Sequence, residues 1–286
     1  MQIQDKALLV RLSIGLPGNS RKDKPLTAEV TAKHQLTGNA GRWLKTLYPP
    51  TAFEPITAIA GDARTFHYAN TLPWMDDGMR ILPTQHHGTY TSEMRVFKRK
   101  FLDTSETHFL CQLSQWESEA RVMHNGTFNP ADYLPECKLR KKFSFATEFQ
   151  PVPSSDDFRV SIANGEMAQI KAELDERLAQ AVADAQADLW RRLADPLAKM
   201  IERLKDPTAT FRDSLVGNLG SIVELIPALN LAADKHLEQF ASEVKLSLGG
   251  LNPQQLRDFP SARNAAAVRA QDILERMSGY FPASQS

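Results

Sequence analysis

The chain has 286 residues, of which 42% are hydrophobic and 24% charged, shares that are close to the averages for globular proteins. The composition excludes wholesale disorder, and no apolar run approaches the roughly 18–20 residues needed to cross a bilayer. Residues 1–150 carry 19 basic and 15 acidic side chains, and residues 151–286 carry 15 and 19. This asymmetry fits either a basic contact surface with an acidic remainder or ordinary scatter of charge on solvated helix faces.

The N-terminal apolar run has no basic region before it and no small-residue cleavage site after it, so we expect no signal peptide. The two cysteines, Cys111 and Cys137, do not form a disulfide framework. A reducing cytoplasm is therefore the expected compartment.

The first half of the chain mixes strands with helices. β-branched and aromatic residues predict strands over residues 7–14, 143–149 and 158–162, and helices are expected over residues 52–72 and 90–123. We expect a small antiparallel sheet on which helices pack.

The predicted helix over residues 90–123 has an apolar face that we interpret as core: Tyr90, Met94, Phe97, Phe101, Phe109, Trp116 and Met123. Before it, Pro73 ends the helix over residues 52–72 and leaves a long irregular loop from Trp74 to Gly88. Loops of that length in a compact domain are often functional.

The second half contains one long amphipathic helix over residues 167–204, in which apolar residues recur at steps of three and four. Asn164 is its expected N-cap, Asp206-Pro207 ends it, and Pro196 is expected to kink it. Its stripe predicts a core face or a coiled-coil seam between copies of the chain, rather than a cofactor site.

Further helical stripes cover residues 211–226, 231–248 and 262–277, with short Pro- and Gly-containing links between them. Helices joined in this way usually pack as antiparallel neighbours. We therefore predict a mainly α protein with a small antiparallel β-sheet (α+β). Residues 1–163 would form a mixed, basic α+β domain, and residues 164–286 a helical bundle, hairpin or coiled-coil domain.

Signatures of catalysis are missing from the sequence: it has no phosphate-binding loop, no dinucleotide fingerprint, no nucleophile elbow and no HExxH motif. We therefore expect neither an enzyme nor a bound cofactor. Asp76 and Asp77 beside Gly78 are interpreted as turn acids or a helix cap rather than as a metal or acid-base pair. His86-His87 is interpreted as a surface loop pair.

His108 and Cys111, which are one helical turn apart, are candidate metal ligands, with His124 and Cys137 further on. Imidazole and thiolate groups suit zinc. No paired CxxC spacing accompanies them, so we expect no metal.

Basic residues alternate with aromatic ones in two segments, residues 95–101 and 138–145. Helical geometry places Arg95 and Arg99 opposite Phe97 and Phe101, with Lys98 and Lys100 at the edges. Such segments are typical of a solvated helix face and a charged strand entrance, of a nucleic-acid surface, or of a surface for an acidic protein partner.

A third region, residues 64–74, could add rings to a groove for nucleic acid. The predicted contact residues are Arg95, Lys98, Arg99, Lys138, Arg140, Lys141, Lys142, Tyr68, Trp74 and Phe143.

Several segments together resemble an uncharacterised group of bacteriophage and prophage proteins: Leu72-Pro73-Trp74, Asp77-Gly78, residues 80–83, residues 139–145 and residues 151–153. The similarity covers most of the chain. Members of this group tend to be encoded beside a MoxR-type AAA+ ATPase and a protein with a von Willebrand factor A-like domain. The resemblance implies a phage origin, a host bacterial cytoplasm and ATPase-linked partners, and it supplies no activity.

Two functional hypotheses follow. The first is a phage DNA-metabolism accessory protein that binds nucleic acid, single-stranded DNA above all, through the basic first half. The second is a helical adaptor that oligomerises through the long helix and docks a partner such as an AAA+ ATPase. Exposed Phe143, Trp74 or Tyr68 beside the lysines favours the first, whereas buried rings and an exposed stripe over residues 167–204 favour the second.

Overall fold

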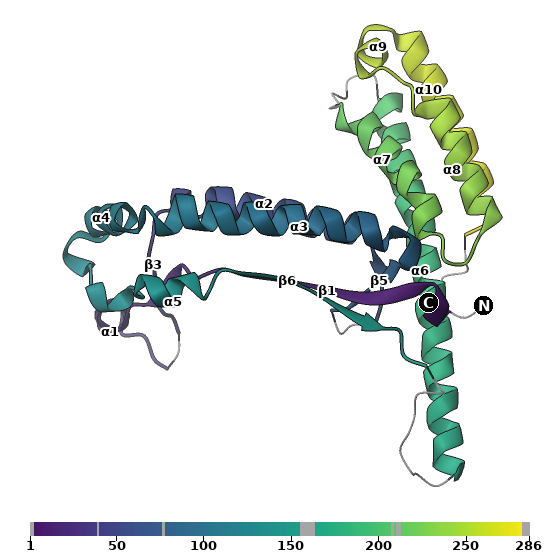
Figure 1. Ribbon diagram of the computed structural model, residues 1–286. Coiled ribbons are helices and arrows are strands. Elements are labelled where there is room, and N and C mark those ends of the chain that lie inside the picture. The colour runs from purple at the N-terminus through teal and green to yellow at the C-terminus, as the bar shows by residue number, and fades with distance from the viewer. Residues whose placement is uncertain are drawn as a thin grey trace. The chain divides into compact units, whose positions relative to one another are not determined.

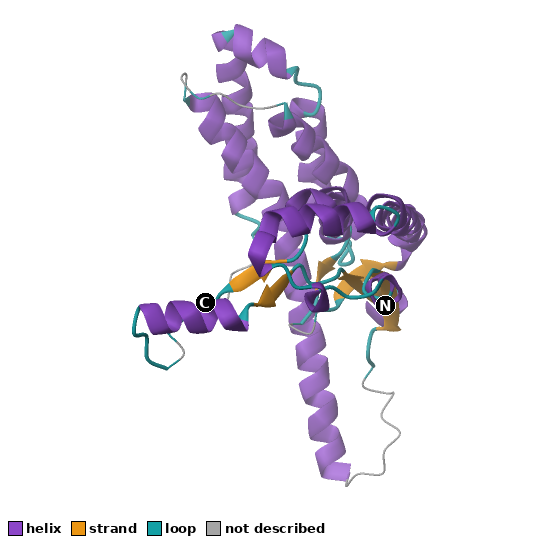
Figure 2. Cartoon of the chain, turned by 90° about the vertical axis from the view of Figure 1, so that its left-hand side faces the viewer, coloured by secondary structure: helices purple, strands orange, loops and turns teal. Residues whose placement is uncertain are grey.

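The computed structural model describes residues 3–38, 40–75, 78–154, 164–206, 209 and 213–281. Helices make up most of this part of the chain, and the strands are short (Figure 2). The predicted α+β class, with a small antiparallel sheet and a helical C-terminal part, is confirmed. No helix in the described ranges is both long and apolar enough to cross a membrane.

The chain divides into two compact units, each assembled from segments that are far apart in sequence. The unit that we call the helical unit comprises Met1–Arg11, His67–Tyr90 and Glu148–Ser286. The unit that we call the basic unit comprises Leu12–Phe66 and Thr91–Thr147. The prediction placed a single domain boundary between residues 163 and 164, whereas these two units alternate along the chain. Residues 155–163 lie outside the described part of the chain.

The helices of the second half follow the predicted stripes. They are α6 (Asn164–Lys205), α7 (Ser214–Leu229), α8 (Lys235–Leu248), the short α9 (Pro253–Asp258) and α10 (Pro260–Ser278). Helix α6 begins at the residue predicted as its cap and continues through Pro196. The helical bundle predicted for this half is confirmed.

The apolar stripe of α6 forms the core of the helical unit. Its buried positions include Leu178, Leu189, Leu193, Leu197 and Met200, and α6 packs chiefly against α10 and α7 (Figure 1). Leu193 and Leu197 are fully excluded from solvent. Because the chain's own helices cover the stripe from Leu178 to Leu204, that part of it is an intramolecular core.

Asp234 joins the start of α8 to α6. Its Oδ1 accepts hydrogen bonds from the backbone N–H groups of His236 and Leu237, which caps the helix. Its Oδ2 accepts from Trp190 Nε1 at 3.1 Å and from Gln186 Nε2 at 2.6 Å. One carboxylate therefore caps α8 and satisfies the indole N–H of a buried tryptophan.

The larger sheet has the strand order β4-β5-β1-β6. Strand β5 (Arg80–Pro83) pairs antiparallel with both β1 (Ala7–Gly15) and β4 (Leu72–Pro73). Strands β1 and β6 (Ser144–Pro151) confirm the predictions over residues 7–14 and 143–149. The strand predicted over residues 158–162 falls outside the described residues.

The prediction of a long irregular loop from Trp74 to Gly88 is wrong. The segment contains β5, a turn of 3-10 helix at Thr84–His86 and the first residues of α3 (His87–Thr104). Backbone pairing of β5 with β1, about 70 residues away in sequence, organises it. The prediction of His86 as a surface loop residue is also wrong. His86 is buried, and its Nε2 hydrogen-bonds Asn70 Oδ1 at 2.7 Å.

Helix α2 (Glu54–Ala69) matches the helix predicted over residues 52–72, but the one predicted over residues 90–123 is interrupted. Helix α3 ends at Thr104, a π-helical segment spans Ser105–Leu110, and α4 covers Leu113–His124. Trp116 Nε1 donates to the carbonyl oxygen of His108 at 3.0 Å, satisfying one carbonyl at the interruption. Met123, predicted in the core, is 47% exposed because the face shifts after this segment.

The remaining elements of the basic unit are the antiparallel strands β2 (Ser20–Lys22) and β3 (Leu44–Thr46), helix α1 (Lys24–Lys33) and the short α5 (Glu136–Arg140). Single turns of 3-10 helix lie at Ile3–Asp5 in the helical unit and, in the basic unit, at Pro50–Ala52, Asn125–Thr127 and Pro130–Asp132.

Aromatic rings fill the core of the basic unit. Phe109 contacts Tyr48, Phe53 and Phe143 at ring-centroid distances of 5.2, 4.7 and 5.4 Å. Phe101 contacts Phe143 at 6.3 Å. The Tyr48 hydroxyl is buried in this cluster without a hydrogen-bond partner among the described residues. Burial raises the pKa of Tyr48, so the hydroxyl stays protonated at neutral pH.

We predict that Leu193→Ala lowers the free energy of unfolding by about 2–5 kcal/mol, because it opens a cavity in the core of the helical unit. Leu246→Ala is the matched control, since Leu246 is 87% exposed on α8 and its truncation should change the free energy by less than about 0.5 kcal/mol. Urea unfolding followed by circular dichroism measures both. Equal effects would show that the α6 stripe is not the core.

We predict opposite outcomes for two buried tyrosines. Tyr48→Phe removes an unpaired buried hydroxyl and should leave stability unchanged or raise it by about 1 kcal/mol. Tyr90→Phe removes the hydroxyl that hydrogen-bonds His67 Nδ1 at 2.7 Å and should cost about 1–3 kcal/mol. Urea unfolding compares the two variants, and a loss of stability in Tyr48→Phe would contradict the assignment.

Candidate nucleic-acid interface

The cations predicted on α3 lie where helical periodicity placed them. Arg95, Lys98 and Arg99 are exposed. Phe101 on the opposite face is completely buried. Within the described part of the chain none of the three cations forms an ion pair, so their charges face solvent uncompensated.

The cations of residues 138–142 fall into two kinds. Lys138, Lys141 and Lys142 are exposed and make no ion pair with any described residue. Arg140 instead hydrogen-bonds the carboxylates of Glu106 and Glu136, and its pKa is raised by these bonds. Arg140 therefore fastens α5 to the π-helical segment, and its charge is already compensated.

The two groups of cations point away from one another. Phe101, on the inner face of α3, contacts Phe143 and Phe145 at the start of β6. Arg95 and Arg99 lie on the outer face of α3, at about 140–180° around the helix from its buried face. The α3 cations therefore project from the side of the layer opposite to β6, and the predicted residues do not line one common groove.

The three predicted stacking rings occupy different environments. Phe143 is only 7% exposed and belongs to the aromatic core, as its alternation with Lys142 and Ser144 had allowed. Trp74 is half-buried against the core of the helical unit. Tyr68 is 57% exposed, but it belongs to the helical unit and lies under the guanidinium of Arg80. None of the three is an exposed ring within the basic unit.

The two histidines among the candidate metal ligands form hydrogen bonds with backbone carbonyl oxygens. His108 Nε2 lies 3.0 Å from the carbonyl oxygen of Thr51, and His124 Nε2 lies 2.6 Å from that of Thr46. Cys111 and Cys137 are exposed thiols. Among the described residues no three His, Cys, Asp or Glu side chains gather in a way that could hold a metal ion, and Asp76 and Asp77 lie outside those residues.

An exposed aromatic ring does occur among cations in the basic unit, at a place that the sequence did not single out. We call the exposed residues Lys22, Lys24, Arg42, Trp43 and Leu44 the Trp43 surface. Trp43 and Leu44 are each 52% exposed. None of its three cations forms an ion pair with a described residue.

Backbone pairing brings the Trp43 surface together from two segments. Strands β2 and β3 are antiparallel, with Lys22 opposite Leu44. Just beyond them, the Asp23 N–H donates to the Trp43 carbonyl oxygen at 3.0 Å. The Trp43 N–H donates to Thr27 Oγ1 at 3.0 Å, which ties it to α1. Trp43 therefore lies beside the chain that carries Lys22 and Lys24.

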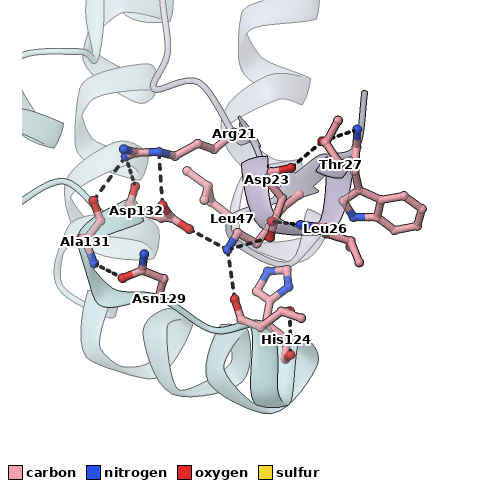
Figure 3. Close-up of polar contacts among 12 residues, drawn as sticks. Arg21, Asp23, Leu26, Thr27, Leu47, His124, Asn129, Ala131 and Asp132 are labelled. Carbon is pink, nitrogen blue, oxygen red and sulfur yellow. Dashed lines mark hydrogen bonds and ion pairs between the residues drawn. The ribbon is translucent and has the colours of Figure 1, made fainter. Parts of the chain in front are cut away.

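A buried lysine holds β3 in place beneath this surface. Lys45 is 6% exposed, and its Nζ lies 2.6 Å from Asp132 and 3.4 Å from Asp23 while donating to the carbonyl oxygen of Thr127 at 3.0 Å. Arg21 adds an ion pair to Asp132 at 3.1 Å and donates to the Ala131 carbonyl oxygen (Figure 3). These contacts attach both strands to the segment around residues 127–132.

The charges in this cluster stabilise one another. The backbone N–H of Leu26 is the main cause of a lowered pKa of Asp23, with Lys45 adding to it against the effect of burial. Burial pulls the pKa of Lys45 down, but its bonds to Asp132 and Asp23 outweigh this effect and raise it. Lys45 is thus a structural cation, with all of its hydrogen-bonding capacity used.

A hollow of about 490 Å³ adjoins the cluster. It is lined by exposed Lys22 and Lys24, by Glu29 of α1 and by Phe128 and Asn129. The hollow shares Lys22 and Lys24 with the Trp43 surface, and its lining carries both basic and acidic side chains.

Charge separates more sharply between the units than between the halves of the sequence. The basic unit contains 16 lysines and arginines against 11 aspartates and glutamates, a net charge of +5, and the helical unit carries the opposite −5. The basic unit is therefore the part of the chain that attracts a polyanion.

The sequence signal for the Trp43 surface consists of two short runs, Arg21-Lys22-Asp23-Lys24 and Arg42-Trp43. Each is too short to stand out alone, and about 20 residues separate them. The β2–β3 pairing and the hydrogen bonds of the Trp43 backbone to Asp23 and Thr27 join them.

We predict that Lys45→Met lowers the melting temperature at pH 7, because it leaves the buried carboxylate of Asp23 without its cation and removes one of the two cations that pair with Asp132. The folded-state pKa of Asp23 lies below its ordinary value of 3.8, so its contribution is complete above about pH 3.8 and is lost as pH falls through the folded pKa. The difference between wild type and variant should therefore shrink toward pH 3. Thermal unfolding from pH 3 to 7 tests this, and a constant difference would contradict the network.

Comparison of the chain with protein-family models, with curated proteins and with solved structures gave no match.

Proposed function

We propose that this protein binds single-stranded nucleic acid, DNA above all, through the basic unit, with Trp43 as the stacking ring and Lys22, Lys24 and Arg42 as phosphate contacts. The observation that carries the proposal is an indole 52% exposed beside cations that have no acidic partner in the described chain. Trp43 and the adjacent Leu44, each 52% exposed, form an apolar patch beside these cations, and an apolar patch with a polar rim marks an interaction site.

The physical basis is the same as in other proteins that bind single strands. Unpaired cations neutralise phosphates and release condensed counterions, while an exposed ring stacks on an unpaired base. Stacking on one face of an indole requires a base that is free of its complement. A single strand therefore suits the Trp43 surface better than a duplex does.

The remaining exposed cations extend the electrostatic footprint. Lys138, Lys141 and Lys142 form one further group, and Arg95 and Arg99 form another on the outer face of α3, with Lys98 at its edge. Because these groups project from different sides of the α3–β6 layer, they act as long-range attraction rather than as one continuous groove.

The biological setting of this proposal comes from the resemblance to phage proteins. It supports an accessory role in phage DNA metabolism, in the cytoplasm of a host bacterium, with an AAA+ ATPase as a partner. The alternative of an oligomerising adaptor has less support, because residues of the α6 stripe from Leu178 to Leu204 are covered by the chain's own helices.

We predict that the protein binds a fluorescently labelled oligo(dT) of about 20 nucleotides with an affinity that falls steeply with salt. Three neutralised phosphates, one each at Lys22, Lys24 and Arg42, give a slope of log affinity against log salt of roughly −2, at about 0.7 per contact. Trp43→Ala should weaken binding by about 1–3 kcal/mol with the slope nearly intact, since stacking releases few ions. Charge reversal of Lys22, Lys24 and Arg42 should instead flatten the slope.

Matched controls come from the helical unit. Phe259→Ala removes a ring of similar exposure, 58%, and charge reversal of the exposed Arg191, Lys199 and Lys235 changes the net charge by the same amount. Both should leave affinity close to that of wild type. Absence of any binding to single-stranded DNA or RNA at about 50 mM salt would rule out the proposal. If neither Trp43→Ala nor charge reversal of Lys22, Lys24 and Arg42 weakens binding, the Trp43 surface is not the binding site.

A further inference from the structure

A second hollow, of about 440 Å³, lies within the helical unit, between α6, α7 and the end of α2. Its floor is apolar: Leu189 of α6, and Ile222, Leu225, Ile226 and Leu229 of α7. Its rim is polar and comprises Tyr68, Arg80, Asp188 and Arg192. A volume in the range of roughly 300–1,000 Å³, with an apolar lining and a few convergent polar groups, is typical of a small-molecule site.

The two arginines at the rim differ in how their charge is compensated. Arg192 pairs with Asp188 at 2.8 Å and donates to the carbonyl oxygens of Ala69 and Thr71. Arg80 donates from Nε to Thr71 Oγ1 at 2.7 Å and from Nη2 to the Thr71 carbonyl oxygen at 3.1 Å. Within the described residues Arg80 has no carboxylate partner, and its Nη1 has no acceptor.

The charge on Arg80 is held in an unfavourable place. Burial, and then the nearby charge of Arg192, lower the pKa of Arg80, and they outweigh the opposite effect of the Asp188 carboxylate. His67 beside it is neutral at pH 7, because burial lowers its pKa to about 4. The rim therefore holds two guanidinium groups against one carboxylate, Asp188, and carries a net positive charge. A half-buried guanidinium of this kind is stabilised by an anion that completes its hydrogen bonds.

Tyr68 restricts the orientation of the Arg80 guanidinium. The guanidinium carbon lies 4.8 Å from the Tyr68 ring centroid, and this cation–π contact holds the guanidinium over the ring. The ring itself is 57% exposed at the rim. The positive group is thus fixed above the hydrophobic floor formed by α7.

We infer that this hollow binds a small amphipathic carboxylate, whose anionic head pairs with Arg80 and whose hydrocarbon body covers Leu225 and Ile222. The apolar floor alone would accept any hydrophobic molecule. The unpaired cation at the rim selects one with a negative head, because a neutral head leaves the guanidinium uncompensated.

Isothermal titration calorimetry with octanoate, octanol and acetate on the full chain separates the two contributions. Octanoate should bind with a dissociation constant of about 1 mM or tighter, octanol at least about tenfold more weakly, and acetate not measurably. Equal binding of octanoate and octanol would overturn the role of Arg80. No binding of octanoate at about 10 mM would overturn the site.

Variants then locate the head group. Arg80→Gln should weaken octanoate binding by at least about tenfold and leave octanol binding unchanged. Arg191→Gln is the control, because Arg191 is the exposed neighbour of Arg192 on α6 and does not line the hollow. Unchanged octanoate affinity in a folded Arg80→Gln protein contradicts the inference. If that variant fails to fold, the comparison of the three ligands on wild type decides the question.

Discussion

Burial of one face of α6 is the constraint on which the helical unit depends. Leu193 and Leu197 are completely excluded from water, and each buried leucine contributes about 1.5–3 kcal/mol relative to an exposed one. Once this face is covered by α7 and α10, the other faces of α6 have fixed positions. Trp190 then reaches Asp234 at the start of α8, and Arg192 reaches the last carbonyl groups of α2. A single helix thus sets the place of elements that precede and follow it by many residues.

The cations of the described chain fall into two kinds, those that pair with carboxylates and hold segments together and those that have no acidic partner. Lys45 and Arg140 have acidic partners that compensate their charges, and both join segments of the basic unit. Lys22, Lys24 and Arg42 have none in the described chain, and they surround an exposed ring. Arg80 also has none, although it is half-buried. Because an uncompensated cation is costly in proportion to its burial, the exposed group of Lys22, Lys24 and Arg42 supports the proposed polyanion site, and half-buried Arg80 supports the inferred site for a small anion.

The sequence predicted what depends on local periodicity and failed where distant segments decide. The stripes of α6, α7, α8 and α10 are local, and all were predicted. The π-helical interruption after Thr104 was not predicted, and at this place Trp116 Nε1 donates back to the His108 carbonyl oxygen. Strand β5 was missed because its partner strand β1 lies near the N-terminus. The exposure of Arg95 and Lys98 was predictable from their chemistry, whereas the carboxylate partners of Arg140 and the exposure of Trp43 required the fold.

The interleaving of the two units has a consequence for the order in which the chain acquires structure during synthesis. The chain crosses between the units four times, and the last segment of the basic unit ends at Thr147, before any part of α6 has been made. Strand residues Leu9 and Leu72 belong to the core that α6 completes, so they await a helix that begins only at Asn164. Contacts so distant in sequence form slowly, and uncovered apolar strands associate with other chains. The nascent protein therefore passes through a stage in which the whole basic unit has been synthesised while the apolar strands of the helical unit are still uncovered.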